Sequence, residues 1–262
     1  QVTADGAGQA PAPPLDPGHA RMLDLLKSIA EEARREHPIL GDKNARELRE
    51  QVRSREAALG DDPSPDDVLS TLRLHWLLGH AELKRGNLDE GIDRYNTVLE
   101  GLIRLSKKHK VEIPPVLDIQ LAYDMGLAHM RRGETNNCCR RNSPDSCLLP
   151  IRGDGVYTDQ KDAKQAIQYY TKVLRNSRKE SPLHLKARWL LNITYMTISG
   201  YPDQVPREYL IEPSIFDSEE TFPRFTNIAA QLGLNTFDLL GGAIVDDFNG
   251  DELEVCVDCY LE

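Results

Sequence analysis

The stretch that decides the fold is LHWLLGHAELKRGNLDEGIDRYNTVLE, residues 74–100. Apolar side chains recur at helical spacing on both sides of Gly86, which predicts two helices joined by a tight turn. Gly91 stands where a small residue lets the two helices touch, and Tyr95 and Val98 supply bulk behind it. Helical hairpins need small residues where backbones cross and large residues where gaps must be filled. The stretch therefore predicts one helical hairpin.

This hairpin resembles the tetratricopeptide consensus over most of its period of about 34 residues. Leu78 and Gly79 occupy the leucine-glycine pair of that motif. Two positions depart from it, because His75 takes the usual tryptophan position and Glu82 the usual aromatic one. The resemblance implies that successive hairpins stack side by side. We therefore expect a mainly α fold, a tetratricopeptide-like α-solenoid of helical hairpins with a small β-containing C-terminal appendage.

A second hairpin is predicted with a long insert in its middle. Residues 125–133 match the first helix and turn of the motif, and residues 166–173 match its second helix. Gly133 and Ala166 are 33 positions apart, whereas the equivalent glycines of the first hairpin are five apart. A loop of this length inside a compact hairpin is unusual and is often functional.

A third hairpin begins at Pro182, has Leu191 and Asn192 at the leucine-glycine position, and is not followed by a second helix in the pattern. These observations predict five parts of the chain. They are a disordered linker at 1–17, N-terminal capping helices at 18–60, repeats at 64–200 with a cysteine-containing insert at 134–161, an irregular strap at 201–221, and a short helix with an acidic β-hairpin at 222–262.

The composition limits the classes of partner and location. The net charge is −10 and the pI about 5.3, which argues against nucleic acid as a main partner. No apolar run is long enough to span a bilayer, so no transmembrane segment is expected in the chain. The chain begins at Gln1 with a proline-rich stretch, and it has five cysteines. We expect an extracytoplasmic protein, periplasmic or secreted, whose N-terminal linker is a candidate membrane tether.

The C-terminal loop places oxygen-bearing side chains at alternate positions. Asp247, Asn249 and Asp251 have the spacing that points carboxylate and amide oxygens at one centre, which suits calcium. Glu252 follows Asp251 directly, where calcium loops usually have glycine. Two interpretations stay open: a weak calcium site, or an acidic hairpin turn that holds no ion. No other cofactor is expected.

The same region also resembles a second family. RFTNIAAQLGLN (224–235) and GGAIVDDFNGDELEV (241–255) are similar to the entry of an FG-GAP, or VCBS, propeller of the cartilage-acidic-protein-like type. The segment 189–211 resembles the connector of bacterial members, so the likeness covers roughly residues 120–262. It implies adhesion or scaffolding outside the cytoplasm, with calcium in the blades. Only one or two strands of such a propeller are present in this sequence.

The cysteines admit several interpretations. A disulfide from Cys147 to Cys138 or Cys139 would staple the insert and stabilise it by roughly 2–3 kcal/mol. The alternatives are free thiols, or a site for copper or zinc with His129 as an added ligand. Cys256 and Cys259 form a CxxC pair on a predicted strand, where a local disulfide is the default and a redox role the alternative.

No catalytic motif is present, so the sequence predicts a protein that is not an enzyme. Candidate partner-binding residues lie on the predicted repeat helices and beside the insert: His75, His80, His129, Arg131 and Arg132. We expect an exported protein–protein interaction scaffold that binds a partner protein through the repeat surface. The alternatives are a metal- or redox-active accessory protein that uses the cysteine insert, and a dedicated subunit of a membrane-attached complex.

Overall fold

The computed structural model describes residues 17–36, 41–110, 112–141, 143, 145–217, 226, 228, 231, 243–246 and 254–257. This part of the chain is mainly helical, which confirms the predicted helical class. The helices are α1 (Pro17–Glu36), α2 (Lys43–Ala58), α3 (Pro65–Lys84), α4 (Leu88–His109), α5 (Pro115–Glu134), α6 (Lys161–Asn176) and α7 (Pro182–Thr197). Short turns are η1 (Thr135–Cys139, π-helical), η2 (Gly153–Gly155) and η3 (Pro213–Phe216), and the strands are β1 (Ala243–Asp246) and β2 (Glu254–Val257).

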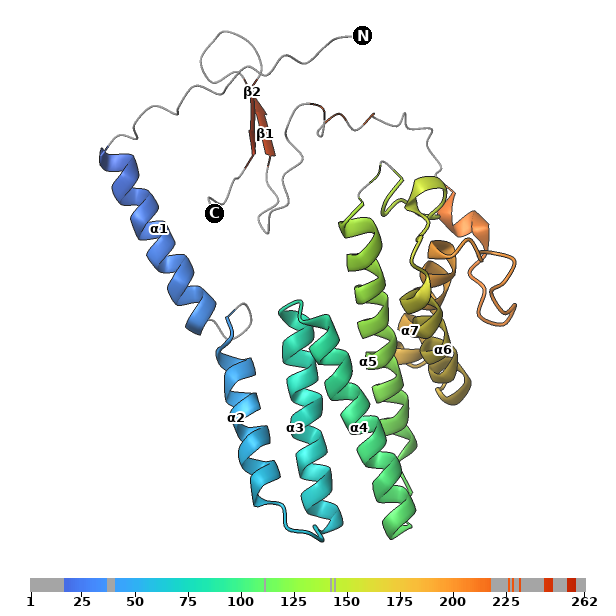
Figure 1. Cartoon of the computed structure of the whole chain (residues 1–262). Helices are drawn as coiled ribbons and strands as arrows, with labels where there is room; N and C mark the ends of the chain where they lie inside the picture. The colour runs from blue at the N-terminus through green and yellow to red at the C-terminus, as the bar shows by residue number, and fades with distance from the viewer. Residues whose placement is uncertain are drawn as a thin grey trace.

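Each helix from α2 to α7 packs on the next one along the chain (Figure 1). The most extensive contacts join α3 to α4 and α5 to α6, the two pairs that the sequence predicts as hairpins. Buried side chains of α3, α4 and α5 form one apolar core, and those of α5, α6 and α7 form a second. Ser64 and Ser181 cap α3 and α7 by accepting hydrogen bonds from Asp67 N and His184 N, each at 3.2 Å.

Helices α3 and α4 approach closely through two glycines. A Cβ atom on Gly79 would lie 2.6 Å from the ring of Tyr95, and one on Gly91 would lie 2.7 Å from Leu83 Cγ. Both distances are shorter than any ordinary carbon–carbon contact, so only glycine allows this approach. Gly86 makes the turn between the helices with φ of 81°, a conformation that favours glycine. The predicted positions of all three glycines are confirmed.

The two departures from the tetratricopeptide pattern both face α2. Glu82 is fully buried, forms an ion pair with Arg49 of α2 at 2.5 Å, and accepts a hydrogen bond from Asn87 Nδ2 at 2.7 Å. His75 is also buried, and its Nε2 lies 3.1 Å from a carboxylate oxygen of Glu56 on α2. A buried charge needs such a partner to offset its loss of hydration. The polar residues therefore attach α2 to the first hairpin.

Asn192 departs from the pattern for a similar reason at the other end. It takes the place of the small residue on α7, and its side-chain amide donates to Tyr209 O at 2.9 Å and accepts from Ile211 N at 3.0 Å. Arg188 donates from Nε to the same Tyr209 carbonyl at 3.1 Å. Tyr209 is buried in the second core. Residues 201–211 therefore lie along α7, where a second helix of the third hairpin would otherwise pack.

The sequence predicts that the first helix of the second hairpin ends at Gly133, and this prediction is wrong. It continues to Glu134 and passes directly into the π-helical turn η1. Gly133 is not among the residues with positive φ, so it makes no turn of the Gly86 kind. Asn137 of η1 donates to the Gly133 carbonyl at 2.8 Å, which keeps the chain coiled beyond the glycine. The insert therefore begins as an extension of α5.

Strands β1 and β2 pair antiparallel, with Ala243 opposite Val257. The loop between them carries the predicted calcium ligands Asp247, Asn249 and Asp251, which lie outside the described residues, as does Cys259. Residues 1–16 of the predicted linker also lie outside them. Among the described helices, none combines the length and apolar character needed to cross a bilayer.

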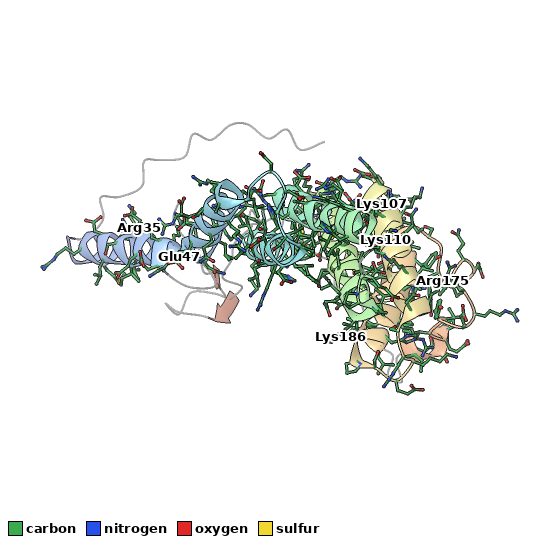
Figure 2. All side chains as sticks on the ribbon, turned by 90° about the horizontal axis from the view of Figure 1, so that it is seen from below. Arg35, Glu47, Lys107, Lys110, Arg175 and Lys186 are labelled. Carbon is green, nitrogen blue, oxygen red and sulfur yellow. The ribbon has the colours of Figure 1, made fainter. Side chains whose placement is uncertain are left out.

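Charged side chains point outward from the helices when the molecule is viewed from below (Figure 2). Lys107 lies in the last turn of α4 and Arg175 in the last turn of α6. Positive charge at these positions interacts favourably with the negative end of the helix dipole. The basic residues there stabilise helix ends within an acidic protein.

Replacing Gly91 with leucine should destabilise the protein by about 1–3 kcal/mol, because the new side chain overlaps Leu83 at the α3–α4 crossing. Urea unfolding followed by circular dichroism measures the change. Gly60→Leu is the control, since a Cβ atom there meets nothing within 4 Å. If both variants unfold at the urea concentration of the original chain, the crossing is not closely packed.

Candidate functional site

His75 and His129, both predicted to contact a partner, are buried within the chain. His75 is 3% exposed and lies between Glu56 and Arg94, whose Nη1 is 3.5 Å from His75 Nδ1. His129 is 7% exposed and stacks on Tyr169. Burial lowers the pKa of both rings below the usual value of 6.5. These histidines hold helices together and offer no surface to a partner.

His129 and Arg132 both bind Asp162, which lies on the far side of the insert. His129 Nδ1 is 2.7 Å from Asp162 Oδ1, and Arg132 donates from Nη2 to the same oxygen at 2.7 Å. Arg132 also forms an ion pair with Asp89 of α4 at 2.6 Å. Burial opposes ionisation of Asp162, but the hydrogen bonds from Arg132 and His129 outweigh it and lower the carboxyl pKa. Arg132 of α5 therefore connects this helix to α4 and α6. Its neighbour Arg131 is exposed.

His80 is the most exposed of the three predicted partner-binding histidines, and it lines a surface cavity. Its ring stacks with Trp76 at a centroid distance of 6.5 Å, and its side chain is 45% exposed. Trp76 Nε1 donates to Asp124 Oδ2 at 2.8 Å, and His80 Nε2 lies 3.4 Å from the same oxygen. Gln120 donates to the other Asp124 oxygen at 3.1 Å. Burial raises the pKa of Asp124, against the opposing effects of its three polar neighbours.

The second ring nitrogen of His80 is also occupied. Tyr95 Oη lies 2.8 Å from His80 Nδ1. Burial raises the pKa of Tyr95. Both ring nitrogens of His80 therefore contact oxygen atoms of the protein, Oη of Tyr95 and Oδ2 of Asp124.

Trp76 and His80 border an apolar cavity of about 380 Å³, which we call the α3–α5 groove. Leu69 and Leu77 of α3 are exposed at its edge, 37% and 44% respectively. Arg73 is also exposed there, and no ion pair to it occurs among the described residues. The lining residues are Leu69, Leu72, Arg73, Trp76, Leu77, His80, Val98, Leu102 and Leu117. The groove thus combines an apolar floor with one basic side chain at its rim. Of this set the sequence identified only His80, because recognising the others requires knowing which helices are adjacent.

The insert is fixed at its base and on α7. Asn137 is 2% exposed, its amide donates to Asp159 O at 3.0 Å, and its side-chain oxygen accepts from Asp159 N at 3.0 Å. Tyr157 N donates to Thr197 O at the end of α7 at 2.8 Å. The two ends of the insert are therefore held together by the Asn137 side chain, which is bonded to the backbone of Asp159.

Three thiols gather where α5 runs into the insert. Cys138 Sγ lies 3.4 Å from Glu134 O and 3.9 Å from Tyr157 Oη. All three are free thiols in this structure, and the predicted disulfide stays a prediction. Burial raises the pKa of each thiol.

No group of three or more metal-ligating side chains occurs within the described part of the chain. His129, the added ligand in the metal interpretation, instead binds Asp162. Cys256 is a residue of β2, and its predicted bond to Cys259 involves a position outside the described residues.

Comparison with known proteins gives no match, whether with family models, curated proteins or solved structures. Function is therefore inferred from the contacts of the chain itself.

The unfolding free energy should fall as the pH drops below about 6.5, because the unfolded chain protonates His75 and His129 near that pH while the folded chain resists. Each histidine contributes a slope of up to about 1.4 kcal/mol per pH unit, down to its own lowered pKa. Asp162 affects stability in a separate, lower pH range. Its contribution to the unfolding free energy is lost as the pH falls from the usual carboxyl value of 3.8 through the lowered pKa of Asp162.

Urea unfolding at pH 7.0, 6.5, 6.0 and 5.5 measures this slope. His129→Gln keeps a donor toward Asp162 but does not titrate, so it should make the slope shallower. His109→Gln, the same change at the end of α4, is the control. An unchanged slope in His129→Gln would show that the ring takes up its proton at the same pH in the folded and the unfolded chain, so that burial does not lower its pKa.

Proposed function

We propose that this protein is a non-catalytic protein–protein interaction scaffold, built as a tetratricopeptide-like solenoid and working outside the cytoplasm. The single observation that carries the proposal is the α3–α5 groove, where exposed Leu69 and Leu77 border an apolar cavity. Large apolar side chains that remain in water beside a concave surface are typical of sites that bind a partner.

The polar residues at and beside the groove support binding rather than chemistry. Asp124, His80 and Tyr95 form a chain of contacts in which both imidazole nitrogens of His80 already have a protein partner. General base catalysis requires a group within reach of the substrate proton. The same contacts fix the orientation of Trp76, because its indole N–H is held by Asp124. A large side chain that is already ordered loses little entropy when a ligand packs on it.

The chemistry of the groove also indicates the class of partner. One apolar side chain of about leucine size fits against Trp76 and Leu77, and Arg73 at the rim suits an acidic group next to it. The proposed ligand is therefore a peptide segment of a partner protein with an apolar anchor and an adjacent carboxylate. The extracytoplasmic location is supported by the cysteine content and by the composition of the N-terminal linker.

Leu77→Asp should weaken binding of such a segment, because it places a charge at the edge of the apolar floor. A displayed peptide library, selected on the intact protein, supplies the ligands, and titration calorimetry measures their affinity. We expect at least a tenfold weaker affinity for Leu77→Asp, equivalent to about 1.4 kcal/mol.

Ile103→Asp is the matched control, since Ile103 is 41% exposed on α4 and does not line the groove. It makes the same change in charge at a similar exposure. If selected peptides bind Leu77→Asp as well as they bind Ile103→Asp, or if no acidic-apolar peptide is selected, the groove is not the binding site.

A further inference from the structure

Helix α1 exposes a continuous apolar stripe, which we define as Met22, Leu25, Leu26 and Ile29. These residues recur every three or four positions, which places them on one face of the helix. Their exposed fractions are 49%, 59%, 47% and 52%. No described side chain of α1 is buried, whereas every helix from α2 to α7 has buried side chains. Apolar side chains that gather on one exposed face are typical of an interaction surface.

Among the described residues, α1 is attached to the rest of the chain at its C-terminal end. Asp42 N donates to Arg34 O at 2.8 Å, and Lys43 of α2 forms an ion pair with Glu36 at 2.8 Å. From there α1 extends away from the other helices in both views (Figure 1 and Figure 2). A helix of 20 residues that packs on nothing is marginally stable in water, because helical stability in proteins comes mostly from an apolar face that packs. The stripe therefore requires an occupant.

We propose that the occupant is α1 of a second copy of this chain, so that two copies form a dimer through a pair of antiparallel α1 helices. The proposal does not depend on what the α3–α5 groove binds. The residues that line the groove all lie outside α1, so pairing of the two stripes does not occupy it.

The charges of α1 favour a protein occupant over a lipid surface. The helix has four basic and four acidic side chains, which are Arg21, Lys27, Arg34 and Arg35, and Asp24, Glu31, Glu32 and Glu36. Helices that lie on membranes are usually rich in Lys and Arg on their polar face, whereas the charges of α1 sum to zero. The whole chain has a net charge of −10, which anionic lipid headgroups would repel.

The position of two of these charges indicates a second copy. Arg21 lies just before the stripe and Glu32 just after it, 11 positions further on. Because 11 positions are about three helical turns, both side chains lie on the same edge of the stripe. Both are exposed, and neither has an ion-pair partner among the described residues. The edge therefore carries a positive charge near one end and a negative charge near the other.

This edge is complementary to itself when two copies pair in opposite directions. Antiparallel helices bring like edges together, so Arg21 of each copy faces Glu32 of the partner subunit. A two-fold axis repeats the contact and gives two ion pairs. The same arrangement places Met22 near Ile29 of the partner subunit, so the apolar stripes also cover each other. In a parallel pair each edge would face the opposite edge of the other helix, and Arg21 would not meet Glu32.

The test measures the sedimentation equilibrium of the full chain in reducing buffer, where cysteines cannot link the copies. We expect a reversible dimer whose fraction increases with protein concentration, since one helix from each copy makes a small interface. Leu26→Asp should weaken the dimer at least about tenfold, because it places a charge in the middle of the stripe. Ile103→Asp is the matched control, since Ile103 is 41% exposed on α4, outside the stripe, and this variant should dimerise like the original chain.

Charge reversal tests the antiparallel direction. Arg21→Glu alone brings like charges together at both contacts, and so does Glu32→Arg alone, so each variant should dimerise about tenfold more weakly. An equal mixture of the two variants restores opposite charges at both contacts, and it should form a mixed dimer with about the original affinity. Both substitutions are compatible with the helix dipole, and circular dichroism verifies that the helices form.

Three outcomes would overturn the proposal. They are a chain that stays monomeric at about 1 mM, a Leu26→Asp dimer as stable as that of Ile103→Asp, and a mixture of charge-reversal variants that associates no more tightly than each variant alone. A chain that is monomeric in solution and binds vesicles of phosphatidylcholine and phosphatidylglycerol through the stripe would also overturn it, in favour of a lipid surface.

Discussion

The structure depends above all on the bonds between Asp162 and two residues of α5, His129 and Arg132. A helical hairpin is normally held by its short turn, but a long insert separates α5 from α6 in this chain. Closing a loop costs more entropy as the loop lengthens, so the two helices need contacts that replace the turn. Asp162 supplies them at the first turn of α6, and the ring of Tyr170 packs against Gly126 further along. The second apolar core contains side chains of both α5 and α6, so it requires these two helices to be packed together.

The same bonds explain why an insert is tolerated at this position. Asn137 and Asp159 close the insert at its base, so its remaining residues do not disturb the packing of α5 on α6. An insert at the α3–α4 turn would destabilise the fold more, because Gly86 sets both the direction of the chain at this turn and the position of Gly91 against Leu83. The two hairpins are thus built on one pattern but held by different interactions.

Much of the helical framework was predictable from local sequence. The turn at Gly86 and the crossing at Gly91 each depend on residues close in the chain, and both were predicted correctly. The end of α5 was predicted wrongly, because a glycine alone does not stop a helix when Asn137 supplies a partner for its carbonyl.

The candidate sites were less predictable. The partner of His129 lies 33 positions away and that of Trp76 lies 48 positions away. Sequence alone marked the histidines as polar residues on helices and did not separate buried from exposed ones. His75 and His80 are five positions apart, yet one is enclosed by α2 and the other faces a groove. That distinction arises from the packing of neighbouring helices.

The contact between Asn192 and residues 209–211 determines what can pack on the exposed side of α7. Asn192 is fully buried, and its side-chain amide is bonded to the backbone of Tyr209 and Ile211. Another helix placed on this face would have to displace both hydrogen bonds and leave the buried amide without partners, which is unfavourable. Residues 209–211 therefore close this face of α7 against a further helix.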